Sequence, residues 1–225
     1  MGQEITNTGP FLIFGHRGSP KRHPENTIAS FEETLRAGAD GFETDLRLLS
    51  DKPAVLYHDD EFQDAAIESL TMPQCADRGA TIEPLASLAR FAGRATMILE
   101  VKRASWEETL IEAVSAWPDI VIASFDHSVV TTLRSRGVTI PLGITMHGVI
   151  VDVADYAMRI GATWCFPNYR YVTEPMVASL HACGIKVVPW TANRPAEWTR
   201  LRELGCDGVI TDVPAEAVQW RSSVC

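Results

Sequence analysis

Three carboxylates occur inside two apolar segments that read as buried strands. Glu43 and Asp45 stand two positions apart in the segment 41–48, and Glu100 lies near the end of the segment 96–101. Because side chains alternate along a strand, Glu43 and Asp45 share one face. A charge in a buried strand is costly unless it is paired or bound to a metal. If these faces point into one site, three hard oxygen ligands without a cysteine favour Mg²⁺ or Ca²⁺ over zinc.

Nearby basic residues leave a second interpretation of these acids open. Arg17, Arg47 and Lys102 could pair with them in a buried salt-bridge network. The repetition of charged residues at the same end of several strands favours the metal site over this network. Arg17 and Lys102 would then remain as donors for an anionic substrate, and the forked guanidinium of arginine suits a phosphate.

Two of the six histidines end apolar runs. His16 follows the run 11–15, and His58 follows the run 54–57, at the ends of strands where α/β barrels keep their catalytic groups. Two histidines beside a metal suit a displacement in which one accepts a proton and the other gives one to the leaving group. Together with the carboxylates they indicate metal-assisted hydrolysis of a phosphate ester. The remaining histidines read as structural or exposed: His23, His127, His147 and His181.

Short apolar runs alternate with amphipathic ones along the whole chain, which indicates parallel strands joined by helical crossovers. Strands are expected at 11–15, 41–48, 96–101, 120–123, 140–144, 163–166, 186–190 and 208–211. Helices are expected at 26–37, 84–91, 106–116, 127–136, 152–160, 173–183, 195–204 and 214–221. Residues 54–57 are expected to continue the second strand, and 59–84 to be irregular. Eight strand–helix units predict an α/β fold, a closed (β/α)₈ TIM barrel formed by a single domain over residues 1–225. A doubly wound open sheet is the alternative, although no GxGxxG motif follows the first strand.

Composition narrows the possible partners. The 20 Lys+Arg against 29 Asp+Glu give a net charge of −9, which argues against a protein that coats nucleic acid or anionic membrane. The five cysteines are widely spaced without a CxxC pair, so neither a zinc site nor a disulfide framework is indicated. Residues 1–10 do not resemble a signal peptide, and no apolar run reaches the ~18 residues of a membrane span. We expect a cytoplasmic protein with a small-molecule substrate, and the sequence indicates no oligomeric state.

An ordered set of motifs resembles the glycerophosphodiester phosphodiesterase family. The motifs are Gly15-His16-Arg17-Gly18, Pro24-Glu25-Asn26-Thr27, Glu43-x-Asp45, His58-Asp59, Glu100-Val101-Lys102, Ser124-Phe125-Asp126, Trp190-Thr191-Ala192-Asn193 and the closing run 207–214. The resemblance implies a TIM barrel of the PLC-like phosphodiesterase type. It also implies hydrolysis of glycerophosphodiesters to glycerol 3-phosphate and an alcohol with a divalent cation.

The resemblance further implies roles for individual residues. These are catalytic His16 and His58, metal-binding Glu43, Asp45 and Glu100, phosphate-binding Arg17 and Lys102, and glycerol-side Phe125 and Trp190. His58 is favoured as the proton donor to the leaving alcohol, although the two histidines could exchange roles. Phe125 and Trp190 could instead be ordinary barrel core. Glu25 and Asn26 are expected to cap the first helix and to order the loop that carries His16, and Asp59 is expected to orient a neighbouring group.

One stretch departs from the family pattern. Residues 60–66 lack the Arg-Thr-Thr that typically follows the His-Asp pair, and the interval 59–96 is short for the family's insertion. We therefore expect a reduced insertion after the second strand and a more open mouth that admits bulkier leaving groups such as a lysophospholipid head. The alternative functions are a lysophospholipase D-like or cyclic-phosphate-forming phosphodiesterase, and a barrel that binds glycerophospho ligands without hydrolysis.

Overall fold

Eight parallel strands close into a barrel in the computed structural model of the protein, which describes residues 9–224. The barrel strands are β1 (Leu12–Gly15), β2 (Gly41–Leu48), β7 (Thr96–Val101), β8 (Ile120–Ser124), β9 (Leu142–Met146), β10 (Trp164–Pro167), β11 (Lys186–Val187) and β12 (Gly208–Thr211). They pair in the order β11-β10-β9-β8-β7-β2-β1-β12. The backbone N–H groups of Asp207 and Ile210 donate to the carbonyls of Val187 and Pro189, both at 2.9 Å, and join the last strand to β11. The prediction of a closed barrel is thereby confirmed, and the open sheet is excluded.

Side chains alternate between the barrel interior and the layer under the helices. On β7, Met97 and Leu99 belong to the outer apolar core, whereas Ile98 lies in the separate interior cluster that also contains Phe14, Phe166 and Ile210. Strand β2 pairs with β7 so that Glu43 stands opposite Ile98 and Asp45 opposite Glu100. The two-residue period therefore turns all three carboxylates into the barrel, as the sequence predicts.

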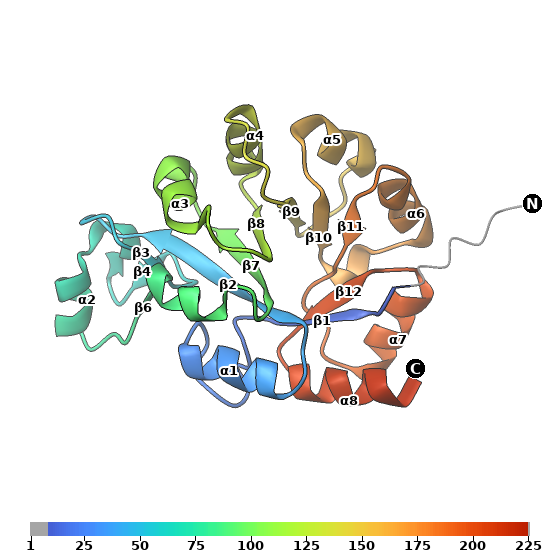
Figure 1. The fold of residues 1–225 in the computed structure, drawn as a ribbon, viewed down its shortest axis with the longest axis horizontal. Helices are drawn as coiled ribbons and strands as arrows, with labels where there is room; N and C mark the ends of the chain where they lie inside the picture. The colour runs from blue at the N-terminus through green and yellow to red at the C-terminus, as the bar shows by residue number, and fades with distance from the viewer. Residues whose placement is uncertain (1–8, 225) are drawn as a thin grey trace, which may run out of the picture.

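Helices surround the barrel on its outside (Figure 1). They are α1 (Ile28–Arg36), the 3₁₀ helix η2 (Leu85–Phe91), α3 (Glu107–Val114), α4 (His127–Ser135), α5 (Val153–Ile160), α6 (Glu174–Ala182), α7 (Pro195–Glu203) and α8 (Pro214–Val224). A further short 3₁₀ helix, η3 (Tyr169–Tyr171), follows β10. Among the described residues, no helix combines the length and the apolar character that a bilayer crossing requires.

The segment between β2 and η2 differs from the expectation. Residues 54–56 form a separate strand, β3 (Ala54–Leu56), that turns back and pairs antiparallel with β2. The following stretch is not irregular, because it contains β4 (Glu61–Phe62), β5 (Ala65–Ala66), η1 (Ile67–Ser69), α2 (Met72–Asp77) and β6 (Glu83–Pro84). A small apolar core of its own stabilises this insertion, which projects beside the barrel at the end of β2 (Figure 1).

Candidate active site

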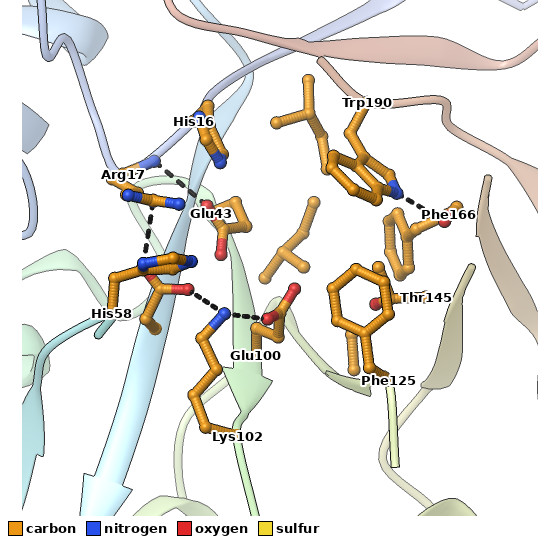
Figure 2. Close-up of a pocket in the computed structure, with 14 residues that line it drawn as sticks. His16, Arg17, Glu43, His58, Glu100, Lys102, Phe125, Thr145, Phe166 and Trp190 are labelled. Atoms are coloured by element: carbon orange, nitrogen blue, oxygen red, sulfur yellow. Dashed lines mark hydrogen bonds and ion pairs between the residues drawn. The ribbon is translucent and has the colours of Figure 1, made fainter. Parts of the chain in front are cut away.

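A cavity of about 160 Å³ opens at the carboxyl ends of the barrel strands. It is lined by His16, Arg17, Glu43, Asp45, His58, Ile98, Glu100, Lys102, Ala123, Phe125, Thr145, Phe166, Trp190 and Ile210. All nine site residues expected from the sequence are in this set. Figure 2 shows that the charged side chains gather on one side of the cavity and the aromatic ones on the other.

The three carboxylates form one buried cluster. Each of Glu43, Asp45 and Glu100 offers an oxygen, and these oxygens all lie within 4.8 Å of one another. The three side chains are almost fully buried. Such proximity of like charges away from water requires positive charge close by or the protonation of one carboxylate.

Two basic residues supply part of that charge. Lys102 Nζ lies 2.6 Å from Asp45 Oδ1 and also pairs with Glu100. Arg17 Nε lies 3.1 Å from Asp45 Oδ2, an ion-pair contact without the alignment of a hydrogen bond. The ion-pair network that the sequence left open is therefore present in part and coexists with the candidate metal site. Arg47 takes no part in it, contrary to that interpretation, because its guanidinium is bound elsewhere.

Glu43 is the carboxylate that this arrangement compensates least. Its burial, with the charges of Asp45 and Glu100 beside it, raises the pKa of Glu43 well above its usual range. Burial works in the same direction on Asp45, but Lys102 and Arg17 outweigh it and lower the pKa of Asp45. When all three are ionised, three carboxylates against two cationic side chains leave one negative charge in excess. An all-oxygen donor set with excess negative charge fits a hard dication such as Mg²⁺ or Ca²⁺.

The loop that carries His16 is held to the carboxylate strand. Arg17 has a positive φ of 53°, and its backbone N–H donates to Glu43 Oε2 at 3.0 Å. Asn26 donates from Nδ2 to Asp45 Oδ2 at 2.9 Å. The expectation that Glu25 and Asn26 cap the first helix is wrong: Thr27 is the N-cap, and Glu25 accepts from Arg17 Nη1 at 2.9 Å. Both residues nevertheless order the loop that carries His16, as expected, because Glu25 binds Arg17 and Asn26 ties the loop to a metal-ligand candidate.

His16 is oriented by Asp212, a residue of the closing run 207–214 for which no role was expected from the sequence. Its Nδ1 lies 2.7 Å from Asp212 Oδ1, and Asn193 Nδ2 donates to Asp212 Oδ2 at 2.7 Å. Although burial alone would raise the pKa of Asp212, the hydrogen bonds from His16 and Asn193 lower it, so the carboxylate is ionised. An ionised carboxylate only accepts, which places the proton on Nδ1 and leaves His16 Nε2 free as a base. Asp212 follows β12 directly, the same strand-end position that singled out His16.

We expect Asp212→Asn to lower kcat about 10- to 100-fold, because the amide no longer fixes the His16 tautomer. Asp207→Asn is a matched control, since Asp207 pairs with His181 at 2.9 Å at the other end of the same strand. Both variants are compared by kcat for a phosphodiester and by Tm. Equal kcat values in the two variants would refute the orienting role of Asp212.

His58 is held through its backbone as well as its ring. Its Nδ1 lies 2.7 Å from Oδ1 of the exposed Asp59, consistent with the orienting role expected for Asp59. Arg47 donates from Nη2 to the His58 carbonyl at 2.8 Å. The buried Arg47 guanidinium is itself fixed by Asp60 at 2.7 Å and by Glu68 at 3.1 Å. Arg47 therefore links the insertion to the position of His58.

We expect Arg47→Lys to lower kcat roughly tenfold, because a lysine cannot reproduce the fork that binds the His58 carbonyl and Asp60 together. Arg103→Lys is the matched control: Arg103 pairs with Asp60 and Glu68 at 3.3 and 3.5 Å, and in the described part of the chain no hydrogen bond joins it to the His58 carbonyl. Steady-state kinetics at saturating substrate separates the two. A similar loss in Arg103→Lys would show that Arg47 acts only by stabilising the insertion.

Phe125 and Trp190 form the opposite wall of the cavity. Their ring centroids lie 5.4 Å apart with the rings perpendicular, and Trp190 Nε1 donates to the Phe166 carbonyl at 2.9 Å. Phe125 is 44% exposed, so the interpretation of this residue as barrel core is wrong. Trp190 is half-buried and also packs against the interior cluster. The wall gives the less polar part of a substrate an apolar surface.

Comparison with known proteins identifies one family. The chain matches the Glycerophosphoryl diester phosphodiesterase family over residues 16–110 and 70–216. It is 27% identical to a glycerophosphodiester phosphodiesterase of Caldanaerobacter subterraneus subsp. tengcongensis, over 90% of this chain and 94% of that protein. A glycerophosphodiester phosphodiesterase of Bacillus altitudinis is 28% identical, over 94% and 98% of the two chains.

Solved structures show the same fold. The glycerophosphodiester phosphodiesterase of Thermotoga maritima superposes with a TM-score of 0.83 at 23% identity, covering 94% of this chain and 98% of that one. A phosphodiesterase of Oleispira antarctica, in complex with the product sn-glycerol-3-phosphate, also gives 0.83, at 20% identity and over 94% and 96% of the chains.

Proposed function

The chain belongs to the glycerophosphoryl diester phosphodiesterase family, and from this premise we propose that two histidines and a divalent cation carry out its reaction. Phosphodiesterase activity on glycerophosphodiesters follows from the family and from the relatives of that name. The products would be glycerol 3-phosphate and an alcohol. The Oleispira antarctica enzyme, which binds sn-glycerol-3-phosphate, supports this product.

One observation carries the proposal: the three-carboxylate cluster shares its cavity with both histidines. Glu43, Asp45 and Glu100 would hold Mg²⁺ or Ca²⁺. When bound there, the cation would stabilise negative charge that develops on the phosphoryl oxygens. The excess negative charge of the cluster supports a dication over a monovalent ion.

Arg17 and Lys102 would bind the phosphate of the substrate. Arg17 Nε is buried without an aligned acceptor among the described residues, so a phosphate oxygen would supply the missing partner. Lys102, which follows the carboxyl end of β7, reaches Asp45 and Glu100 in the same cavity (Figure 2). Both side chains thereby lie next to the carboxylates that would hold the cation. A phosphate bound there would contact Arg17, Lys102 and the cation together.

The two histidines would divide the proton transfers. Water supplies a hydroxyl group to phosphorus and gives its proton to His16 Nε2, the nitrogen that the Asp212 contact leaves free. The bond between phosphorus and the alcohol oxygen breaks as His58 donates a proton to that oxygen. His58 and the neighbouring Asp59 are partly exposed to solvent, so an alcohol released beside His58 can leave on this side of the cavity.

The direct test is hydrolysis of glycerophosphocholine by metal-stripped protein, with Mg²⁺ or Ca²⁺ added back. We expect activity to be lost in EDTA and restored by a divalent cation. Full activity in EDTA would refute the role given to the three carboxylates. Binding of glycerophosphocholine without turnover, with metal present, would instead support a ligand-binding barrel.

A further inference from the structure

A hydroxyl group stands in the apolar half of the active-site cavity. Thr145 lies on the side that holds Phe125, Phe166 and Trp190, and the charged residues occupy the other side (Figure 2). The other described residues that line the cavity are charged, histidine, aliphatic or aromatic. Because the Trp190 indole N–H is already bound to the Phe166 carbonyl, Thr145 brings to this wall a side-chain group that is able to form a new hydrogen bond.

The two-residue period of β9 turns Thr145 into the barrel. Its neighbours Ile144 and Met146 belong to the outer apolar core, so the side chain between them faces the interior. Thr145 stands opposite Phe166 on β10, a residue of the interior cluster. The inward-facing position before it on β9 is Gly143, where a Cβ would clash with the Phe166 ring. Thr145 is therefore the last inward-facing residue of β9, at the end of the strand that opens into the cavity.

The backbone at Thr145 is tied to the loop that carries Phe125. His127 Nε2 lies 3.1 Å from the Thr145 carbonyl, and His127 Nδ1 lies 2.8 Å from the Tyr156 hydroxyl. Because a carbonyl only accepts, His127 donates to it from Nε2. His127 begins α4, two residues after Phe125. The position of Thr145 relative to the aromatic wall is thereby fixed.

The Thr145 hydroxyl has no partner in the described part of the chain. The hydrogen bonds that Thr145 forms within residues 9–224 involve its backbone, and none involves Oγ1. The residue is 5% exposed and lines the cavity. A hydroxyl that is so deeply buried usually has a partner, so water or a substrate in the cavity would supply it.

The position of the phosphate decides which group of a substrate reaches Thr145. The phosphate belongs with the charged half of the cavity, and the leaving alcohol belongs beside His58, away from the aromatic wall (Figure 2). The glycerol arm then lies against that wall. Its central hydroxyl is next to the carbon that bears the phosphate and stays near the charged half. Its terminal hydroxyl extends farthest from phosphorus and meets the opposite wall.

We propose that Thr145 binds the terminal hydroxyl of the glycerol arm and thereby selects glycerophosphodiesters over other phosphodiesters. The inference rests on the proposed function and deepens it, because it names a residue that recognises glycerol. A threonine hydroxyl can donate to an alcohol and accept from it. An arm without the terminal hydroxyl would leave Thr145 Oγ1 without a partner in the occupied cavity, so such a substrate would be rejected.

The test compares choline phosphodiesters that differ only in the hydroxyls of the arm that stays on phosphorus. They are glycerophosphocholine, (2-hydroxypropyl)phosphocholine, which lacks the terminal hydroxyl, and (3-hydroxypropyl)phosphocholine, which lacks the central one. For the wild type we expect kcat/KM to be about 10- to 100-fold lower without the terminal hydroxyl. Thr145→Val keeps the shape of the side chain and removes its hydroxyl. In this variant kcat/KM for glycerophosphocholine should fall by a similar factor, close to the value for the analogue without the terminal hydroxyl.

Two controls separate binding from a structural role of Thr145. Thr145→Ser keeps the hydroxyl and loses the methyl group, so it should keep the wild-type preference for the terminal hydroxyl. The preference for glycerophosphocholine over the analogue without the central hydroxyl should be the same in wild type and Thr145→Val. Each preference is a ratio of kcat/KM values measured on one preparation, so a smaller fraction of folded protein cancels.

Three outcomes would overturn the inference and leave the proposed function intact, since glycerophosphocholine is hydrolysed in each. In the first, the wild type or Thr145→Val shows a result opposite to the expected one: no preference for the terminal hydroxyl in the wild type, or an unchanged preference in the variant. In the second, Thr145→Val loses the preference for the central hydroxyl instead. In the third, Thr145→Ser loses the preference as fully as Thr145→Val. Absence of turnover for every substrate, with Mg²⁺ or Ca²⁺ present, would overturn the proposed function and the inference with it.

Discussion

Replacing His58 by alanine is expected to lower kcat for glycerophosphocholine by about 10²- to 10⁴-fold, the usual contribution of a general acid. The choline alkoxide is a poor leaving group, so its oxygen needs a proton as the bond to phosphorus breaks. From a p-nitrophenyl diester, the leaving group is the stable p-nitrophenolate anion, which does not need that proton. His58→Ala should therefore hydrolyse glycerophospho-p-nitrophenol at close to the wild-type rate. Initial rates of both proteins on both substrates measure this difference.

His16→Ala is the matched comparison for this result. A base that activates water is needed whatever the leaving group, so His16→Ala should lose a similar factor on both substrates. Recovery of His16→Ala on the p-nitrophenyl substrate, with none for His58→Ala, would reverse the two roles. Equal behaviour of both variants on both substrates would contradict the division of proton transfers.

Replacing Glu43 by glutamine should stabilise the metal-free protein and abolish its activity. The amide keeps an oxygen that can accept the Arg17 N–H bond, 3.0 Å long in the native chain, but removes a buried charge beside Asp45 and Glu100. In EDTA we expect the free energy of unfolding of Glu43→Gln to exceed that of the wild type by about 1–3 kcal/mol. This corresponds to a rise in Tm of roughly 3–10 °C for a protein of this size. A dication at a hundred times its Kd stabilises the wild type by about 2.7 kcal/mol. This stabilisation should be absent in Glu43→Gln.

The pH dependence of this gain has a definite sign. Because the pKa of Glu43 is raised in the folded chain, its ionisation destabilises the fold as the pH rises through that value. The Tm difference between Glu43→Gln and wild type in EDTA should therefore be largest at alkaline pH and shrink as the pH falls toward the ordinary carboxyl range. Glu107→Gln is the control, a buried glutamate that accepts from Ser105 N at 3.1 Å outside the cavity. A stabilised Glu107→Gln, or a destabilised Glu43→Gln in EDTA, would contradict the charge argument.

The barrel and the residues that line its site could be predicted because both depend on short-range patterns. Apolar runs at regular intervals give eight strands, and the two-residue period turns Glu43 and Asp45 inward once the strand is buried. Polar residues that directly follow those runs must meet at one mouth. This is why all nine residues expected at the site line one cavity.

What could not be predicted depends on contacts between distant segments. Asn26 is a favoured N-cap by type, but its positive φ and its bond to Asp45, 19 positions away, place it before the cap. Arg47 could as easily have faced the carboxylates, and only the fold of the insertion gives it Asp60 and Glu68 as partners. The return of β3 onto β2 depends on a turn at 50–53 that lacks an Asn-Gly or Asp-Gly signal.

The most direct test of the central claim is ³¹P NMR of glycerophosphocholine hydrolysis in ¹⁸O-labelled water. With Mg²⁺ or Ca²⁺ present, we expect glycerol 3-phosphate that carries one ¹⁸O on phosphorus, and in EDTA no product. This result would show that water attacks phosphorus and that the reaction requires the cation. Formation of a cyclic glycerophosphate, or of labelled glycerol 3-phosphate at full rate in EDTA, would contradict the account.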